Sequence, residues 1–257
     1  MKKKIFKGIS ILCALACVAA TIQAVRIQYE YKQGEAEYSE LANLLVSPSE
    51  NDVYIVTKHL AAEGEGERAP VDVNFDLLRE MNANVVGWLY SEGTPINYPV
   101  VQSTDNAYYL NRLYNDQTNS AGAIFMDALN SPNLTDANTV IYGHNMKNGS
   151  MFKSLQYYES AYYYNQHPVM YYFTPEHSYK IDVFAGYITP YNSEAYTICF
   201  DSAATYQGYL DRIRINSDVN TTDRVQVTTD DNIITLVTCS YSSSVRYVVQ
   251  GKVTQLS

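Results

Sequence analysis

Residues 232–239 read NIITLVTC and residues 246–255 read RYVVQGKVTQ, and these two apolar runs decide the fold. Both are rich in β-branched residues, which favour strands, and the polar residues between them predict a loop. We therefore expect a strand, a short loop and a returning strand. Such a hairpin would place Cys239 and Arg246 at its open end, within side-chain reach of one another.

Similar strand-forming runs recur from Val85 onward, separated by clusters of Gly, Pro, Asn and Asp. They are VVGWLY (85–90), INYPVV (96–101), GAIFMD (122–127), TVIYGH (139–144), VMYYFT (169–174), YKIDVFAGYI (179–188) and RVQVTT (224–229). The pattern predicts a mainly β fold whose sheet closes on itself. The few helical stretches, at 75–82, 107–114, 150–160 and 203–215, lack the regular alternation of a parallel α/β fold.

The composition narrows the classes of function. The chain has 257 residues, 46% apolar and 18% charged, which suits one large domain or two small ones. Its charge is uneven, because the first 26 residues hold five basic residues and no acid. The remainder carries 13 Lys and Arg against 27 Asp and Glu, a net charge of −14. This acidic body excludes nucleic-acid binding, which needs a basic face. It can attract a cationic partner or simply keep a secreted domain soluble.

The basic end is followed by an uncharged apolar segment, Gly8–Val25. As a helix its 18 residues span about 27 Å, close to the thickness of the bilayer's hydrocarbon core. Lysines before it and an acidic chain after it predict a single-pass anchor with a cytoplasmic N-terminus. A signal peptide cleaved near Ala20 or Ala24, or a lipoprotein signal ending at Cys17, are the alternatives. All three place the working domain outside the cytoplasm.

We divide the chain into three parts on this basis. Residues 1–26 form the basic end and anchor, residues 27–73 a juxtamembrane helix and linker, and residues 74–257 the working domain. The helix is expected over Tyr29–Val46, and the polar stretch Ala61–Pro70 is typical of a linker. Asn74 caps a short helix, with which the compact domain begins.

Three residues together indicate acyl transfer through a thioester. Cys239 ends a buried strand, and His144 ends the strand TVIY, where a scaffold commonly presents a working group. A thiolate nucleophile needs a base or a nearby cation, and His144 can supply either. As imidazolium it would protonate the leaving nitrogen, and once neutral it would deprotonate an incoming amine. Arg246 can hold the oxygen that gains charge or orient the substrate.

Taken singly, each of these residues also has a structural interpretation: a hydrogen-bonded His, a core Cys and a solvated Arg. Of the four Cys, Cys13 and Cys17 lie in the apolar segment, and Cys199 is expected to be a packed thiol. A disulfide between Cys199 and Cys239 would block the proposed chemistry, so we expect both to be reduced. No His, Cys and carboxylate spacing suits zinc, and the chemistry requires neither a metal nor another cofactor.

The same residues resemble the signatures of the sortases, cysteine transpeptidases that attach proteins to the cell wall of Gram-positive bacteria. Residues 235–239 (TLVTC) match the TLxTC signature, residues 142–144 the histidine signature, and Arg246 the arginine. Longer stretches are similar to class B sortases in particular, and the similarity spans 75–253. These stretches are 84–102, 105–110, 121–127 and 140–151.

The resemblance implies an eight-stranded sortase β-barrel with N-terminal helices and a helix between late strands, at 203–215. It implies that Cys239 cleaves a C-terminal sorting signal of secreted proteins after Thr, and that an amine of peptidoglycan or its lipid-linked precursor resolves the thioacyl enzyme. By position, the sorting-signal groove would be lined by Asn106, Leu110, Tyr142, Thr238, Tyr196 and Thr197. Val237, where some class B members have a polar residue, and the short loop from Cys239 to Arg246 are departures.

Two other functions stay open at this point. A cysteine peptidase acting on wall peptides would use the same Cys and His with water as the acceptor. A non-catalytic wall-binding protein would use Cys239 only for packing. The sequence does not separate a transpeptidase from a peptidase, because both form the same thioester.

Overall fold

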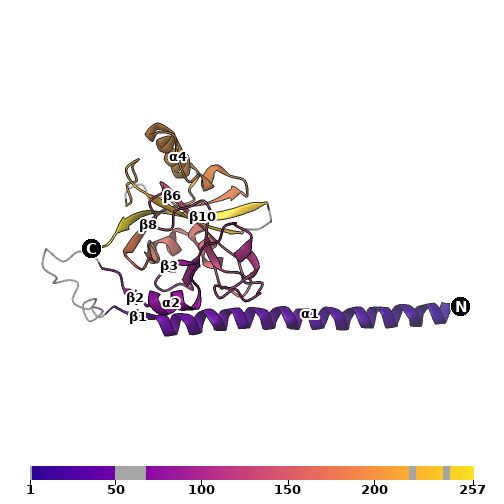
Figure 1. The fold of residues 1–257 in the computed structure, drawn as a ribbon. Helices are drawn as coiled ribbons and strands as arrows, with labels where there is room; N and C mark the ends of the chain where they lie inside the picture. The colour runs from indigo at the N-terminus through magenta and orange to yellow at the C-terminus, as the bar shows by residue number, and fades with distance from the viewer. Residues whose placement is uncertain (1, 50–67, 220–223, 240–243) are drawn as a thin grey trace.

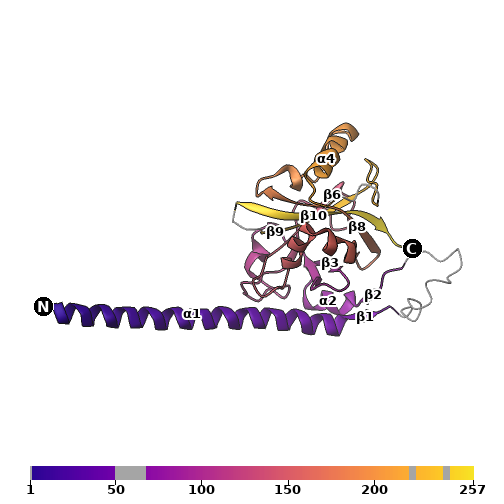
Figure 2. The ribbon, with the colours of Figure 1, turned by 180° about the vertical axis from the view of Figure 1, so that it is seen from behind.

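A long helix and a β-barrel make up the molecule in a computed structural model, which describes residues 2–49, 68–219, 224–239 and 244–257. Helix α1 (Lys2–Leu45) runs past one side of the barrel, and α4 (Ala203–Asn216) lies on the opposite side (Figures 1 and 2). A short ribbon of β1 (Val46–Pro48) and β2 (Val71–Val73) and the helix α2 (Phe75–Met81) connect α1 to the barrel.

Within the described residues, eight strands close the barrel in the order β10-β8-β7-β3-β4-β5-β6-β9. Most neighbours are antiparallel, but β4 with β5 and β6 with β9 are parallel. The bounds are β3 Val85–Tyr90, β4 Asn97–Val101, β5 Ile124–Met126, β6 Asn138–Gly143, β7 Val169–Phe173, β8 Ser178–Pro190, β9 Ile233–Cys239 and β10 Val245–Gln255. The predicted closed, mainly β barrel with a helix between late strands is confirmed.

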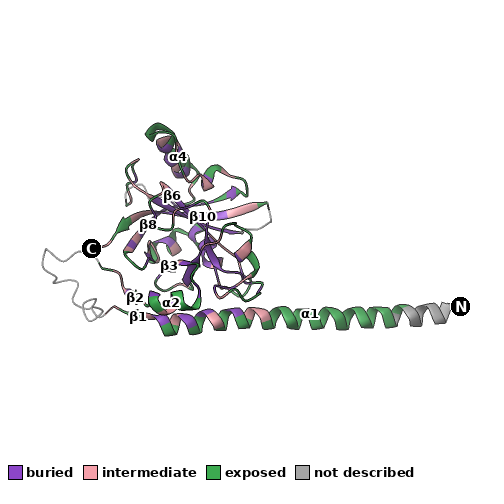
Figure 3. Cartoon of the chain, in the orientation of Figure 1, coloured by how far each residue is buried: buried purple, intermediate pink, exposed green. Residues whose placement is uncertain are grey.

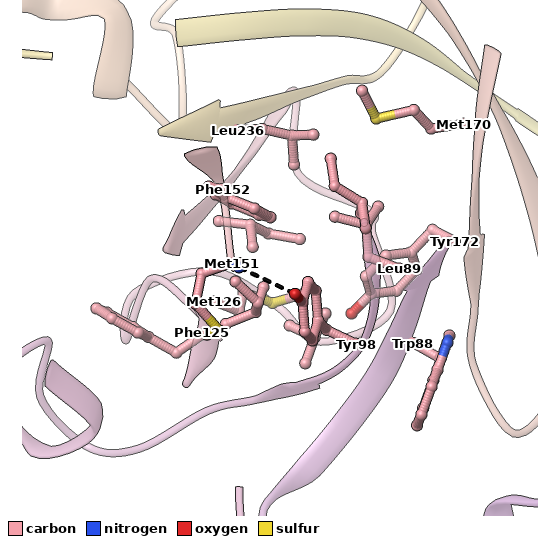
Figure 4. Packing of buried hydrophobic residues seen from close by; sticks show 14 of the residues in the cluster. Trp88, Leu89, Tyr98, Phe125, Met126, Met151, Phe152, Met170, Tyr172 and Leu236 are labelled. Carbon is pink, nitrogen blue, oxygen red and sulfur yellow. Dashed lines mark hydrogen bonds between the residues drawn. The ribbon is translucent and has the colours of Figure 1, made fainter. Parts of the chain in front are cut away.

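Apolar side chains from facing strands fill the barrel (Figure 4). Leu89, Tyr172 and Leu236 are almost completely buried there, and each such side chain removes a large apolar area from water. The backbone N–H of Met151 donates to the Tyr98 hydroxyl at 2.9 Å, which ties the loop after β6 to this core. Because the interior is packed with side chains, the cavities described below lie at its edges.

A second cluster packs α4 against the sheet. Its buried side chains include Tyr206, Leu210 and Ile213, which contact a group containing Phe184 and Val248. Ser202 caps the helix, since its hydroxyl accepts from the Thr205 N–H while the Thr205 side chain bonds back to the cap.

Helix α1 combines two environments in one element (Figure 3). From residue 11 to residue 29 the side chains are exposed, whereas Gly34, Tyr38, Leu41 and Leu45 are buried against the barrel. Their spacing of four, three and four residues keeps them on one face of the helix. Within the described chain, Ile11–Leu45 marks one helix long and apolar enough to cross a membrane, a test that signal sequences also pass.

Some expected elements differ in the structure. Residues 224–229, expected as a strand, form turn and irregular backbone instead, because this run lies outside the closed set of eight strands. The expected helices at 107–114 and 150–160 are short 3₁₀ turns, η2 (Tyr108–Asn111) and η3 (Lys153–Glu159), the second leading into α3 (Ala161–Gln166). Residues 61–67 of the expected linker lie outside the described residues.

Candidate active site

A cavity of about 270 Å³ opens where the ends of β6, β9 and β10 meet. Five of the six residues expected to line the sorting-signal groove lie in its wall, together with His144 and Arg246; the sixth, Thr197, is not in the wall. The full lining is Asn106, Leu110, Phe125, Tyr142, Gly143, His144, Tyr191, Tyr196, Val237, Thr238 and Arg246. The Thr197 carbonyl instead accepts from the Asn138 side chain at 2.9 Å.

Strand register brings His144, Cys239 and Arg246 to the same end of neighbouring strands. In the parallel pair of β6 and β9, Gly143 lies opposite Thr238, so His144 and Cys239 are the next residues of adjacent strands. In the antiparallel pair of β9 and β10, Arg246 lies directly opposite Cys239. The side chain of Cys239 and residues 240–243 lie outside the described part of the structure.

The imidazole of His144 is fixed by a backbone oxygen. Its Nε2 lies 2.7 Å from the Leu110 carbonyl oxygen, which belongs to η2. A carbonyl oxygen only accepts hydrogen bonds, so Nε2 carries a hydrogen in this arrangement. With Nε2 bonded in this way, any proton that the imidazole gains or loses is the one on Nδ1.

Gly122 supports the same ring from another side. Its backbone has φ +62°, and a Cβ at this position would lie 2.9 Å from His144 Cδ2 and 2.7 Å from the Leu110 oxygen. A residue with a side chain would therefore collide with both groups and strain the backbone. Gly122 is not among the site residues predicted from the sequence, although it lies in the stretch 121–127 that resembles class B sortases.

The guanidinium of Arg246 lies in the cavity wall near the start of β10. It is half-buried, and its Nη1 donates to the Val245 carbonyl at 3.0 Å. A guanidinium presents several N–H donors and keeps its charge at all working pH values. The site thus contains a fixed positive group beside the position of Cys239.

The buried carboxylate of Asp127 accepts hydrogen bonds from two residues of the cavity wall. Its Oδ2 accepts from the Tyr142 hydroxyl at 2.9 Å and from Asn106 Nδ2 at 2.8 Å, and the Ala128 N–H donates to Asn106 Oδ1. Burial, followed by the charge of Asp127, raises the pKa of Tyr142 far above its usual value. The Tyr142 hydroxyl therefore stays protonated and bound to Asp127. Sequence analysis did not identify Asp127.

The hydroxyl of Thr238 is a buried polar group in the cavity wall. Its side chain is 1% exposed, and its Oγ1 has no hydrogen-bond partner in the described part of the structure. A buried hydroxyl without a partner costs free energy, which a ligand in the cavity can recover. Thr238 is thus suited to bind a polar group of a peptide.

Comparison with known proteins identifies the family. A family described as the sortase domain matches residues 89–254, more than half of the chain. Sortase B of Listeria monocytogenes is 38% identical over 178 residues, which cover 68% of this chain and 72% of that protein. The chain belongs to the sortase family, in the sortase B class. Sortase B enzymes are cysteine transpeptidases, and this chain is one of them.

Other sortase B proteins extend the match. Sortase B of Staphylococcus aureus is 30% identical over 262 residues and covers 99% of both chains. The structure of the Staphylococcus aureus sortase B-substrate complex superposes with a TM-score of 0.73 at 30% identity, covering 89% of this chain and 100% of that one. The apolar N-terminal helix of this sortase B therefore falls within a match that spans the whole protein.

One cysteine expectation for this sortase B is wrong. Cys199 was expected to be packed, but it is an exposed free thiol, because the segment between β8 and α4 turns it outward while Ile198 and Phe200 pack on the α4 cluster. No group of three or more His, Cys, Asp or Glu able to hold a metal ion occurs among the described residues.

Proposed function

We propose that this sortase B cleaves a C-terminal sorting signal of secreted proteins after Thr and joins the new carboxyl end to an amine of peptidoglycan or its lipid-linked precursor. One observation carries the proposal. A single cavity contains His144, Arg246 and the Thr238 hydroxyl, which has no hydrogen-bond partner among the described residues, and the strand register puts Cys239 opposite Arg246.

In the first half-reaction the Cys239 thiolate attacks the carbonyl carbon of the Thr residue in the signal. The oxygen of that carbonyl gains negative charge, and Arg246 is the group proposed to stabilise it. His144 gives its Nδ1 proton to the leaving nitrogen as the carbon–nitrogen bond breaks. The products are a thioester on Cys239 and a free peptide amine.

In the second half-reaction an amine replaces the thiolate. Neutral His144 accepts the proton of the attacking amine at Nδ1, an amide bond forms, and the Cys239 thiolate is released. Support for an amine acceptor comes from a sortase B structure with a TM-score of 0.72 that is complexed with triglycine, a peptide that begins with an amino group.

The peptide that carries the sorting signal of the substrate protein is proposed to occupy the cavity beside these groups. Leu110, which is partly exposed, and the rings of Tyr142 and Tyr196 would contact its apolar parts, whereas Asn106 and Thr238 would meet its polar groups. Thr197 stays a prediction, since it lies outside the cavity wall.

Helix α1 is proposed to anchor the enzyme as a single-pass segment, with the N-terminus in the cytoplasm and the barrel outside the cell. The apolar, exposed residues from 11 to 25 and the lysines before them support this orientation. The N-terminal sequence of the enzyme recovered from membranes tests it: an intact start supports the anchor, and a start after Ala20 or Ala24 supports a cleaved signal peptide.

Incubating the full-length chain in detergent micelles with a library of peptides tests the reaction. Each reaction is run with and without an amine acceptor such as triglycine, and products are read by mass spectrometry. We expect cleavage after Thr, a thioacyl adduct on Cys239 and an amide product when the amine is present. Cys239→Ala and His144→Ala should abolish turnover.

Other outcomes would favour other functions. Hydrolysis that ignores added amine would support a wall peptidase. An absence of any cleavage or adduct, with peptide still bound, would support a binding protein.

A further inference from the structure

Helix α1 contacts the loop that supports His144. The Tyr38 hydroxyl donates to the Gly122 carbonyl oxygen at 2.9 Å, and Asn119 Nδ2 donates to the Glu30 carbonyl oxygen at 3.1 Å. Gly34 lets the helix approach closely, since a Cβ there would lie 3.2 Å from Asn119 Oδ1. The loop 119–122 is thus held along two turns of α1.

The same loop is in contact with the imidazole. Gly122 lies so close to the ring that an added Cβ would be 2.9 Å from His144 Cδ2. On the other side of His144 in the chain, Asn148 Nδ2 donates to Glu35 Oε2 of α1 at 3.3 Å. Helix α1 therefore forms hydrogen bonds both to the loop that contacts the ring and to Asn148, four residues after His144 in the chain.

We propose that Tyr38 is a positioning residue for His144, acting through the Gly122 carbonyl. The inference rests on the acid–base role proposed for His144 and extends it, because it makes the helix that continues from the N-terminal apolar segment part of the support of the active site. Without the hydroxyl of Tyr38, the Gly122 backbone is free to move away from the ring, and Nδ1 loses its alignment.

Tyr38 is well suited to this task. It is 4% exposed and packs edge-on against Tyr98, with the ring centroids 5.2 Å apart. Burial raises its pKa well above the usual value, so the hydroxyl keeps its proton and donates throughout the working pH range. A rigid, neutral donor fixes one oxygen position without adding a charge beneath His144.

The test uses the full-length chain in detergent micelles with two matched variants. Tyr38→Phe removes the hydroxyl and keeps the ring. Tyr114→Phe is the control, since the Tyr114 ring also packs on Tyr38 while its hydroxyl makes no hydrogen bond within the described residues. For each variant we would measure kcat, KM for the sorting-signal peptide, the thermal midpoint and the NMR resonance of the His144 Cδ2–H. That resonance is assigned by its loss in His144→Ala.

We expect Tyr38→Phe to lower kcat about 10-fold, because a small misplacement of a catalytic group is costly, and to leave KM within about twofold. The His144 Cδ2–H signal should shift in Tyr38→Phe and stay in place in Tyr114→Phe, with kcat of the control unchanged. A merely structural role for Tyr38 would move the thermal midpoint without this split between kcat and KM and without the ring signal.

The outcomes separate this inference from the proposed function. If His144→Ala keeps its activity, both fail together. If His144→Ala is inactive and Tyr38→Phe behaves like Tyr114→Phe, the proposed function stands and the role of Tyr38 is overturned.

Discussion

At the residue scale, small backbone contacts decide how the imidazole is held. The Leu110 carbonyl oxygen lies 2.7 Å from His144 Nε2, and Gly122, which has no side chain, leaves room for the ring. Asp127 plays a comparable part across the cavity, where it holds Tyr142 and Asn106. Each of these contacts is made to a residue that was predicted from the sequence: His144, Tyr142 or Asn106.

Replacing Gly122 by Ala should therefore lower kcat about 100-fold, because the new methyl group would displace the His144 ring. Gly149→Ala is the control: its φ of +93° also carries a backbone penalty, of about 1–2 kcal/mol, but a Cβ there meets no atom within 4 Å. Steady-state kinetics and thermal melts of both variants check this. Equal activity in the two would show that Gly122 matters only for backbone strain.

Replacing Asp127 by Asn should raise KM for the sorting-signal peptide about 10-fold with a smaller change in kcat. Asp127 Oδ2 accepts from both Tyr142 and Asn106 while Oδ1 accepts from the Leu129 N–H, so the NH2 group of an Asn would face a hydrogen-bond donor in either orientation. Asp136→Asn serves as the control, since Asp136 accepts from Asn130 and Ser131 and does not contact this pair. A KM change shared by both variants would contradict a specific role for Asp127.

At the element scale, the hairpin of β9 and β10 carries the thiol and the guanidinium, and an ion pair lies at its other end, where β9 begins and β10 nears its end. Lys252 of β10 lies 2.8 Å from Asp231, just before β9, and the Thr228 N–H also donates to Asp231. Burial opposes the charged form, yet the hydrogen bonds from Lys252 and Thr228 prevail and lower the pKa of Asp231. The pair steadies the strand on which the cavity is built.

This shift predicts how stability depends on pH. Because the folded-state pKa lies below the unfolded value of about 3.9, the stabilisation is complete above that value and is lost as the pH falls through the folded pKa. Asp231→Asn should cost about 1 kcal/mol at pH 7, and the difference from wild type should vanish in strong acid. Thermal midpoints measured against pH test this, with the exposed neighbour Asp230→Asn as an unaffected control. A difference that persists unchanged in acid would contradict it.

At the scale of the whole molecule, one helix joins the apolar N-terminal segment to the active site. The 44 residues of α1 extend about 66 Å, and the last third packs on the barrel through Tyr38, Leu41 and Leu45. The contacts that hold the loop 119–122 come from this docked part. Docking of α1 therefore forms the same hydrogen bonds that hold the loop next to His144.

Leu41→Ala should destabilise this docking by about 2–4 kcal/mol and lower kcat at the same time, since Leu41 is 3% exposed. Leu44→Ala removes the same atoms from a site that is 60% exposed on the same helix and should change neither quantity. Thermal melts and kinetics of the two variants in micelles test the coupling. Lost stability with full activity in Leu41→Ala would uncouple the helix from the site.

Sequence alone predicts the eight barrel strands, the closed mainly β class, the apolar helix and the motifs around Cys239, His144 and Arg246. These are local properties, because side-chain alternation and short signatures lie within a few consecutive residues. Three-dimensional packing sets the rest: residues 224–229 remain outside the barrel, Cys199 faces outward, Asp127 and Gly122 contact residues of the cavity, and Tyr38 bonds to Gly122. Those features depend on contacts such as that between Tyr38 and Gly122, 84 residues apart, and packing rather than local propensity sets them.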